Sequence, residues 1–468
     1  MRDSNGLNVV LVSSYELGRQ PFGLASPAAW LRQVGADVTQ IDLAVEKLDE
    51  EAIRSAALVA FYVPMHTAAR IAAETCKRVR VLNPDAHVCF YGLYAAMNEE
   101  LFRSLGAETI LAGEFEEGLL SLYRRLQSGS DGGDGAEAGP QPEELVSLAR
   151  LQFVAPDRTG LPSLDQYAKV QLPSGEQRVV GYTEATRGCK HLCRHCPIVP
   201  VYGGRFRIVQ RDVVLEDVAA QVAAGAQHVT FGDPDFFNGP THAVKIVEEL
   251  HRRFPDLTYD VTIKVQHLLK NRELLPTLRD TGCMFVTCAV ESVENRILEK
   301  FDKHHTAQDF IEAVGIFQEI GLTMNPTFVT FNPWTTVEGY SRFLALIAEL
   351  DLIQNVSPIQ YAIRLLIPRG SRILELEDIQ ELIGPFDHES LCYRWEHPDP
   401  AVDRLFEDVL AIVKDATARK ANRPSVFAEV WRKTHEYLPD ARVQEPPVDE
   451  ATLVAPATVP FLTEPWYC

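Results

Sequence analysis

The first 126 residues alternate between short continuous apolar runs and longer stretches in which apolar residues recur with helical spacing. Continuous runs are typical of strands buried on both faces, and the periodic stretches are typical of amphipathic helices. The predicted strands are Asn8–Ser13, Asp37–Asp42, Leu58–Val63, His87–Tyr91 and Thr109–Ala112, and the predicted helices include Pro27–Gly35 and Thr67–Asn83. This alternation predicts a Rossmann-like domain with a parallel sheet over residues 1–126.

A segment of different composition follows this domain. From Gln127 to Glu144 the chain is rich in Gly, Ser, Pro and acidic residues. Such a segment cannot bury enough apolar surface to offset the entropy lost on ordering it. Residues 127–146 are therefore predicted to form a flexible linker.

Strand and helix patterns alternate again between residues 147 and 376. The predicted strands are Arg178–Thr183, Gln227–Phe231, Tyr259–Lys264, Met284–Val290, Pro326–Phe331 and Ile359–Ile367. The predicted helices are Val213–Ala224, Thr241–Phe254, Asn271–Thr281, Val293–Lys300, Ala307–Gly321 and Val337–Leu350. These repeats predict a partial (β/α)6 barrel of the TIM type, and the active site of such a barrel lies at the carboxyl ends of its strands.

The rest of the chain changes pattern twice. Residues 377–438 are predicted to be helical, with amphipathic periodicity over Asp403–Lys420 and Arg423–His435. Residues 439–468 are rich in Pro and are predicted to form an extended tail that ends at Cys468. The fold class expected for the whole chain is α/β, with a helical C-terminal region.

Three of the nine cysteines lie close together after the first barrel strand, at Cys189, Cys193 and Cys196. A C-x3-C-x2-C spacing on a short loop can direct three thiolates to one [4Fe-4S] cluster and leave its fourth iron open to a small molecule. A structural zinc site is the alternative, with His191 or His195 as the fourth ligand. Four further cysteines lie in apolar segments and are predicted to be core residues: Cys76, Cys89, Cys283 and Cys288.

The charge of the chain narrows the range of partners. With 65 acidic and 45 basic residues the formal charge is −20, which argues against a nucleic-acid substrate. No apolar run is long enough to cross a membrane and no signal peptide is evident, so a cytoplasmic protein is expected. The cysteine loop is nevertheless basic, through Arg187, Lys190, His191, Arg194, His195, Arg205, Arg207 and Arg211. These residues are predicted to offset the charge of the cluster or to dock an acidic reductase such as flavodoxin or ferredoxin.

The cysteine motif, placed on the first loop of a β/α barrel, resembles that of the radical S-adenosylmethionine (SAM) superfamily over residues 180–376. The resemblance implies that Cys189, Cys193 and Cys196 ligate the cluster and that SAM chelates the open iron. It also implies SAM-binding residues at the carboxyl ends of later strands, where Gly232 begins a partial match to a Gly-Gly-Glu turn. These residues are Gly232, Asp233, Asp235, Lys264, Glu291 and Ser292.

The first domain resembles the cobalamin-binding-like domain that precedes many radical SAM barrels. The likeness rests on Gly92–Ala95 and Gly113–Glu116, which follow the fourth and fifth predicted strands. The cobalt-ligating Asp-x-His-x-x-Gly loop is missing, because Ser13–Gly18 contains no His. The resemblance therefore implies the fold and leaves open whether cobalamin is bound.

Cys468 follows an aromatic pair at the end of the chain. It resembles the first tail cysteine of the radical SAM proteins named for a C-terminal Cys-Sec-Ala-Glu-Pro or Cys-Cys-Ala-Glu-Pro motif. Because the selenocysteine codon is otherwise read as stop, the native chain is expected to continue with Sec after Cys468. A thiol beside a selenol is a soft nucleophile and metal ligand, so Cys468 is predicted to be catalytic.

Together these features predict a radical SAM enzyme, of transferase or oxidoreductase type, that cleaves SAM reductively and acts on a small thiophilic substrate of arsenic or selenium type. Three alternatives remain. A cobalamin-dependent radical SAM methyltransferase would hold a corrinoid in the first domain. A tRNA methylthiotransferase would need a basic RNA-binding module, and a noncatalytic zinc or redox-sensing protein would hold no iron cluster.

Overall fold

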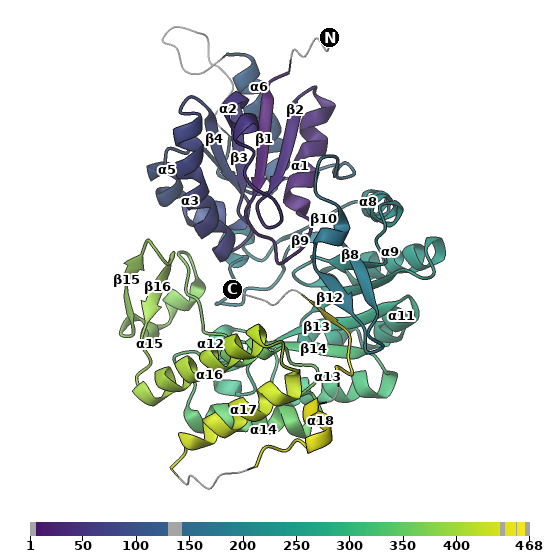
Figure 1. The fold of residues 1–468 in the computed structure, drawn as a ribbon, viewed down its shortest axis with the longest axis vertical. Helices are drawn as coiled ribbons and strands as arrows, with labels where there is room; N and C mark the ends of the chain where they lie inside the picture. Colours follow the sequence, from purple (N-terminus) through teal and green to yellow (C-terminus); the bar gives the residue numbers. More distant parts are fainter. Residues whose placement is uncertain (1–5, 130–142, 440–444, 455, 464–468) are drawn as a thin grey trace.

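The computed structural model describes residues 6–129, 143–439, 445–454 and 456–463. Figure 1 shows an N-terminal sheet, in purple to blue, above a second sheet in teal to green, with the C-terminal helices in yellow-green below. The first sheet is parallel throughout and has the strand order β2-β1-β3-β4-β5-β6. Its strands are β1 (Asn8–Ser13), β2 (Asp37–Asp42), β3 (Leu58–Tyr62), β4 (His87–Tyr91), β5 (Thr109–Gly113) and β6 (Val146–Ser147).

Helices cover both faces of this sheet because its strands are apolar on both faces. In β1, Val9 and Leu11 pack against one helical layer, whereas Val10 and Val12 pack against the other. The first layer consists of α1 (Phe22–Gln33) and α6 (Phe115–Gln127). The second layer consists of α2 (Glu50–Ser55), α3 (His66–Leu82), α4 (Leu93–Met97) and α5 (Glu99–Ser104). A Rossmann-like parallel sheet is thus confirmed.

The predicted linker is structured at both of its ends. Gln127 is the last residue of α6, and Val146 pairs with Ala112 of β5 in the edge strand β6. Most of the segment between them lies outside the described residues, so its flexibility stays a prediction.

The second sheet has the strand order β14-β13-β12-β11-β8-β7-β17. Pairing is parallel from β8 to β14, whereas β7 and β17 each pair antiparallel with their neighbours. The strands are β7 (Lys169–Gln171), β8 (Gln177–Thr183), β11 (His228–Phe231), β12 (Thr258–Ile263), β13 (Cys283–Glu291), β14 (Thr323–Phe328) and β17 (Phe461–Leu462). The sheet is a curled partial barrel, as the sequence predicts.

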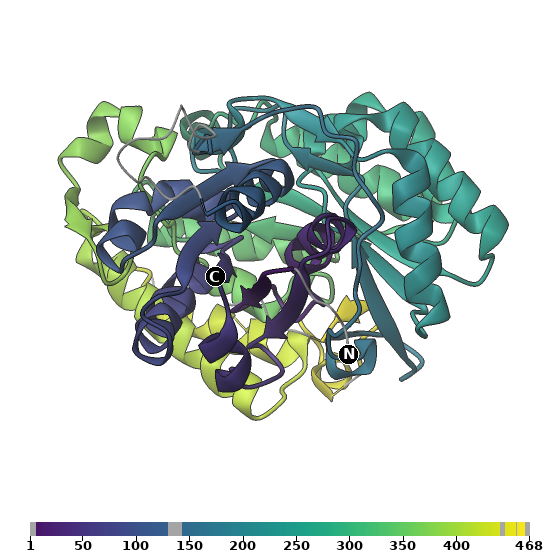
Figure 2. The same ribbon diagram turned by 90° about the horizontal axis from the view of Figure 1, so that it is seen from above.

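The helices of the barrel lie on one side of this sheet (Figure 2). Alternate residues such as Val229, Val261 and Val286 pack against them in the core, while Thr230 and Asp260 face the opposite side. The inward side of the barrel is therefore polar. The helices are α8 (Arg211–Ala223), α9 (Pro240–Arg253), α10 (Val265–Lys270), α11 (Leu275–Asp280), α12 (Asn295–Phe301), α13 (Ala307–Ile320) and α14 (Val337–Glu349).

The sixth predicted strand, Ile359–Ile367, does not form. Residues Pro358–Ala362 are a 3-10 helix, η4, and one parallel bridge joins Phe331 to Arg364 beyond it. The physical reason lies in Gln360, whose Oε1 accepts a hydrogen bond from Phe328 N at 2.8 Å. A side chain thus satisfies the edge of β14 that a sixth strand would have paired.

The C-terminal region is helical and is joined to the barrel by a small hairpin. The helices are α15 (Glu377–Gln380), α16 (Pro400–Ala418), α17 (Arg423–Glu436) and α18 (Glu450–Val454), and the hairpin pairs β15 (Ile383–Asp387) with β16 (Cys392–Trp395). Within the predicted extended tail over residues 439–468, α18 is helical instead of extended, whereas β17 is extended as predicted. The backbone of β17 pairs with the free edge of β7 and so adds to the barrel sheet.

Cys468 lies outside the described residues, so its predicted catalytic role and the predicted selenocysteine stay predictions. Among the residues that the structure describes, no helix has both the length and the apolar character needed to cross a membrane.

Candidate active site

The three clustered cysteines lie on one loop that a short hairpin closes at its base. Strand β9 (Thr186–Gly188) pairs antiparallel with β10 (Phe206–Ile208), and the short helix α7 (Val199–Tyr202) lies within the loop. Gly188 has a φ of 72°, and a Cβ at this position would come within 2.3 Å of the Tyr202 ring. Glycine therefore allows the chain to turn from β9 into the cysteine motif.

The thiols of this loop are shielded from water. Cys189 and Cys193 are buried, and Cys196 is half-buried. The pKa of Cys189 is raised to about 11 and that of Cys196 to about 12, chiefly by burial and in smaller part by neighbouring cysteines of the motif. Such thiols are poor free nucleophiles, whereas a bound metal deprotonates its thiol ligands outright. The environment suits buried metal ligands.

Two lysines approach the cysteines from the barrel. Lys264, which follows β12, places Nζ 3.4 Å from Cys193 Sγ. Lys303, which follows α12, is also buried. Burial disfavours the charge of Lys303, but Glu291, Cys193 and Cys196 outweigh that effect and raise its pKa. Both ammonium groups can offset the negative charge of thiolate ligands.

Glu291 connects the end of β13 to the cysteine loop. Its Oε1 accepts a hydrogen bond from Lys303 Nζ at 3.1 Å and lies 3.3 Å from His195 Nε2. Burial opposes the charge of Glu291, but Lys303 and His195 hold its pKa well below the usual range. The residue has a φ of 70° where the register of β13 shifts. Backbone strain of this kind is characteristic of functional sites.

A chain of polar groups runs from Asp235 to the cysteine loop. His267 Nδ1 lies 2.6 Å from Asp235 Oδ2, and His267 Nε2 lies 3.1 Å from His191 Nε2. Burial lowers the pKa of His191 to about 3, which keeps this ring neutral. Potential ligand atoms of Cys189, His191 and Asp235 all lie within 4.8 Å of one another. These three side chains offer the ligand types of a zinc site, which is the alternative to an iron-sulfur cluster.

Asp233 and Gly232 hold the turn after β11 against the cysteine loop. Asp233 accepts hydrogen bonds from Ala185 N at 2.9 Å and from Thr186 Oγ1 at 2.6 Å. Burial raises the pKa of Asp233 to about 7. The Tyr182 hydroxyl packs directly against Gly232. A Cβ atom at Gly232 would lie only 1.9 Å from this hydroxyl oxygen. Both residues thus position the loop, and their contact with SAM stays a prediction.

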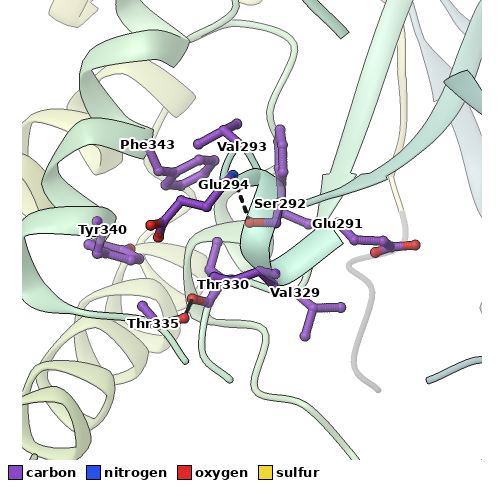
Figure 3. Close-up of a pocket in the computed structure, with 12 residues that line it drawn as sticks. Glu291, Ser292, Val293, Glu294, Val329, Thr330, Thr335, Tyr340 and Phe343 are labelled. Carbon is purple, nitrogen blue, oxygen red and sulfur yellow. Dashed lines mark hydrogen bonds between the residues drawn. The ribbon is translucent and has the colours of Figure 1, made fainter. Parts of the chain in front are cut away.

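Ser292 and its neighbour Glu291 line a small hollow at the carboxyl ends of β13 and β14 (Figure 3). Ser292 Oγ accepts a hydrogen bond from Glu294 N at 3.1 Å, and Thr335 Oγ1 donates to Thr330 O at 2.9 Å across the hollow. The hollow measures about 290 Å³ including its mouth. This volume is at the lower end of the range for small-molecule sites.

A larger cleft lies between the N-terminal sheet and the barrel. It measures about 850 Å³ including its open side. One wall is formed by the loops that follow the parallel strands of the first sheet, and the other by the cysteine loop and the end of β8. Lining residues include Leu17, Met65, Leu93, Phe115, Tyr182 and Ile198. Ligands of parallel α/β sheets bind at this carboxyl edge.

Arg187 does not face the cysteines as the local charge of the loop suggests. It lies 2.7 Å from Glu116 and from Glu184, and 3.5 Å from Glu114. The Arg187 side chain is 6% exposed, and its three carboxylate partners include two from the N-terminal domain. This buried cluster fastens the cysteine loop to the first domain and forms part of the interdomain cleft.

Two residues of the site escaped sequence reasoning. Lys303 lies in a short turn between two helices, and His267 lies in a helix that begins directly after Lys264. Each contacts its partner only after strands distant in sequence pair. The position of His267 three residues after Lys264 was the available indication, because residues after a barrel strand belong to the active-site face.

Comparison with known proteins supports this arrangement. The profile of the Radical SAM superfamily matches residues 183–338. An uncharacterized methyltransferase of Pyrococcus horikoshii is 23% identical over 356 residues, which are 71% of this chain and 74% of that protein.

Solved structures show the same order of domains. The radical SAM methyltransferase TsrM of Kitasatospora setae, with cobalamin and a [4Fe-4S] cluster bound, has a TM-score of 0.58 at 20% identity, covering 74% of this chain and 73% of its own. The cobalamin-dependent SAM radical enzyme OxsB, with aqua-cobalamin and SAM bound, has a TM-score of 0.64 at 14% identity, covering 93% and 69%. These likenesses establish a shared fold. Residues 183–338 therefore form a Radical SAM domain that follows an N-terminal Rossmann-like domain, the chain is an enzyme, and the cofactors of such a domain are a [4Fe-4S] cluster and SAM.

Proposed function

We propose that this enzyme is a cobalamin-dependent radical SAM methyltransferase that acts on a small molecule. The observation that carries the proposal is the interdomain cleft, which joins the carboxyl edge of a cobalamin-domain-like sheet to the cysteine loop. The related methyltransferase and the two cobalamin-containing structures support this function over the thiophilic substrate that the tail suggested. When bound, the cluster and SAM supply one-electron chemistry, and cobalamin supplies a methyl carrier.

Cys189, Cys193 and Cys196 are the proposed ligands of the cluster. Their burial and the approach of Lys264 Nζ to Cys193 Sγ at 3.4 Å fit a buried, negatively charged group. Lys303 and Glu291 are the proposed polar partners of SAM, because the pair is buried beside the cysteines. Its charges can position the amino and carboxylate groups of SAM. Gly232, Asp233, Asp235 and Ser292 are proposed to shape the same site.

The chemistry of the cleft fits a corrinoid. At about 850 Å³ the cleft can take part of this large cofactor, and the remainder would extend through the open side. Glu16 Oε2 and Arg19 Nε are buried without a hydrogen-bond partner in the described structure, and both residues line the cleft. Burial raises the pKa of Glu16 and so favours its protonated form, in which the carboxyl can donate as well as accept a hydrogen bond. Such groups match the amide side chains at the edge of a corrinoid.

The loop after β1 supplies no histidine to cobalt. Leu17 lines the cleft at this position. A leucine does not coordinate metal, so this position would give a bound corrinoid an apolar contact in place of a cobalt ligand. Leu17 and Phe115 would help to exclude water from the cleft.

The test is anaerobic reconstitution of the full chain with iron, sulfide and hydroxocobalamin, followed by gel filtration. One corrinoid and one cluster per chain are expected to remain bound. With SAM and a reductant, formation of S-adenosylhomocysteine should depend on the corrinoid, because the methyl group must leave SAM for the carrier.

A pair of tryptophan substitutions locates the corrinoid. Met65→Trp would fill the cleft and should abolish corrinoid retention, whereas Ile71→Trp places the same bulk on an exposed position of α3. SAM cleavage without corrinoid binding would overturn the proposal and leave another radical SAM reaction. Stoichiometric zinc in place of iron would instead favour the site of Cys189, His191 and Asp235.

A further inference from the structure

A second cavity, which we call the inner chamber, lies on the inward side of the barrel sheet. It measures about 610 Å³ including its mouth, a volume typical of small-molecule sites. Its floor consists of inward-facing residues of three neighbouring strands, Asp260, Thr287 and Asn325. Phe461 of β17 lies at its edge. The cysteines and the residues proposed to bind SAM do not line this chamber.

Two arginines from outside the sheet line the inner chamber. Arg19 comes from the loop between β1 and α1, and Arg423 is the first residue of α17. Neither lies within 4.0 Å of a carboxylate oxygen in the described part of the chain. Arg19 Nε is buried without a hydrogen-bond partner there, and Arg423 donates to Gln354 O at 2.5 Å.

In the part of the chain that the structure describes, neither arginine has an ion-pair partner, and Glu16 interacts with Arg19 only at longer range. Burial lowers the pKa of Arg423 to about 10, and its guanidinium lies 4.7 Å from the centre of the Phe461 ring. Both residues are half-buried, and a partly desolvated cation without an ion-pair partner is stabilised when an anion binds to it. Arginine also matches the planar geometry of a carboxylate with two parallel hydrogen bonds.

Two other polar side chains of the inner chamber indicate which class of anion it can bind. Asp260 accepts hydrogen bonds from His228 Nε2 at 2.9 Å and from Thr230 Oγ1 at 2.6 Å, both at Oδ1. Its other oxygen and the buried, unpartnered Asn325 Oδ1 remain available to accept from donors on a ligand. A carboxylate in the same chamber repels a phosphate dianion more than a monoanion. A carboxylic acid that also carries hydrogen-bond donors fits best.

We propose that the inner chamber is the substrate site of this enzyme and that it takes a small carboxylate-bearing molecule, bound by Arg19 and Arg423. The proposal rests on the proposed function in one respect. Arg19 lines both the inner chamber and the interdomain cleft, so a carboxylate bound there lies beside the proposed methyl carrier. Asp260 and Asn325 orient the donor groups of the substrate.

The test is calorimetric titration of the reconstituted full chain with 3-phenylpropanoate, whose ring suits the Phe285 and Phe461 walls. Matched titrations use 2-phenylethylamine, phenyl phosphate and L-phenylalanine, with and without hydroxocobalamin. The carboxylate is expected to bind at least about tenfold more tightly than the amine and the phosphate, and L-phenylalanine at least as tightly as 3-phenylpropanoate. Because no turnover is needed, this readout is independent of corrinoid binding and methyl transfer.

Substitutions then assign the binding groups. Arg19→Met and Arg423→Met should each weaken 3-phenylpropanoate about tenfold or more, and Arg252→Met, on the exposed face of α9, should change nothing. Arg423→Lys keeps the charge and should recover part of the loss, which separates recognition from misfolding. Equal affinity for the amine, unchanged binding in both Met variants, or no binding of any carboxylate at about 20 mM would overturn the proposal.

Discussion

Lys264 Nζ lies 3.4 Å from Cys193 Sγ, although the two residues are 71 positions apart in the chain. The contact arises because β8 and β12 both end at the active-site face of the barrel and flank β11. A buried ammonium group beside a thiolate ligand stabilises added negative charge. The lysine is therefore expected to set the reduction potential of the cluster.

Replacing Lys264 by Met should shift the cluster potential to more negative values by about 60 mV, a tenfold change in the one-electron equilibrium. Spectroelectrochemical titration of the reconstituted protein measures this shift. Lys270→Met, at the exposed end of α10, is the matched control. An unchanged potential in Lys264→Met would show that the ammonium group does not act on the cluster.

Each cysteine of the motif should be required for the iron site. Cys189→Ala, Cys193→Ala and Cys196→Ala are expected to reduce iron from about four atoms per chain to almost none, because a cluster with three protein ligands tolerates no further loss. Iron analysis and absorption spectra measure this loss. The control is Cys76→Ala, which changes a buried cysteine in the core of the N-terminal domain. This variant should bind as much iron as the unsubstituted protein. Full iron content in one of the three motif variants would show that the substituted cysteine is not a ligand of the cluster.

Arg187→Met should destabilise the protein by about 3 to 5 kcal/mol, because it leaves buried carboxylates without their counter-charge. The substitution removes the cationic partner of Glu116 and Glu184, whose carboxylates each lie 2.7 Å from the Arg187 guanidinium. Urea unfolding monitored by circular dichroism measures the free energy. Arg252→Met, which removes an exposed ion pair, should cause no comparable change. Equal effects of the two substitutions would mean that the buried cluster contributes little.

Asp42, at the end of β2, should make stability depend on pH. Burial raises its pKa to about 6, so the folded protein favours the protonated form. The stabilisation is complete below the unfolded pKa and is lost as the pH rises through about 6. Asp42→Asn is thus expected to increase the free energy of unfolding by about 2 kcal/mol at about pH 8, and by less at about pH 4.5.

Urea unfolding at the two pH values checks this dependence. Asp37→Asn, at the exposed start of the same strand, serves as the control. The expectation for Asp42 is contradicted if its substitution has the same effect at both pH values.

Most strands were predictable within a few residues because each is a local apolar run that needs burial on at least one face. Asn8–Ser13 and Asp37–Asp42 match the structure residue for residue. Ile359–Ile367 failed because its apolar pattern also fits a buried 3-10 turn, and Gln360 satisfies the neighbouring strand edge instead. Local pattern does not report which backbone groups are already paired.

The sequence by itself determined the order of elements and the cysteine motif, because strand burial, helix periodicity and ligand spacing are all local properties of the chain. Only the tertiary structure decided the partners of each charged residue. Arg187 belongs to a basic stretch in sequence, yet it pairs with Glu116 in the first domain. Lys303 carried no local indication that it pairs with Glu291 beside the cysteine loop, and Arg423 carried none that it lines the inner chamber. Charge acts over distances in space, and the fold alone sets those distances.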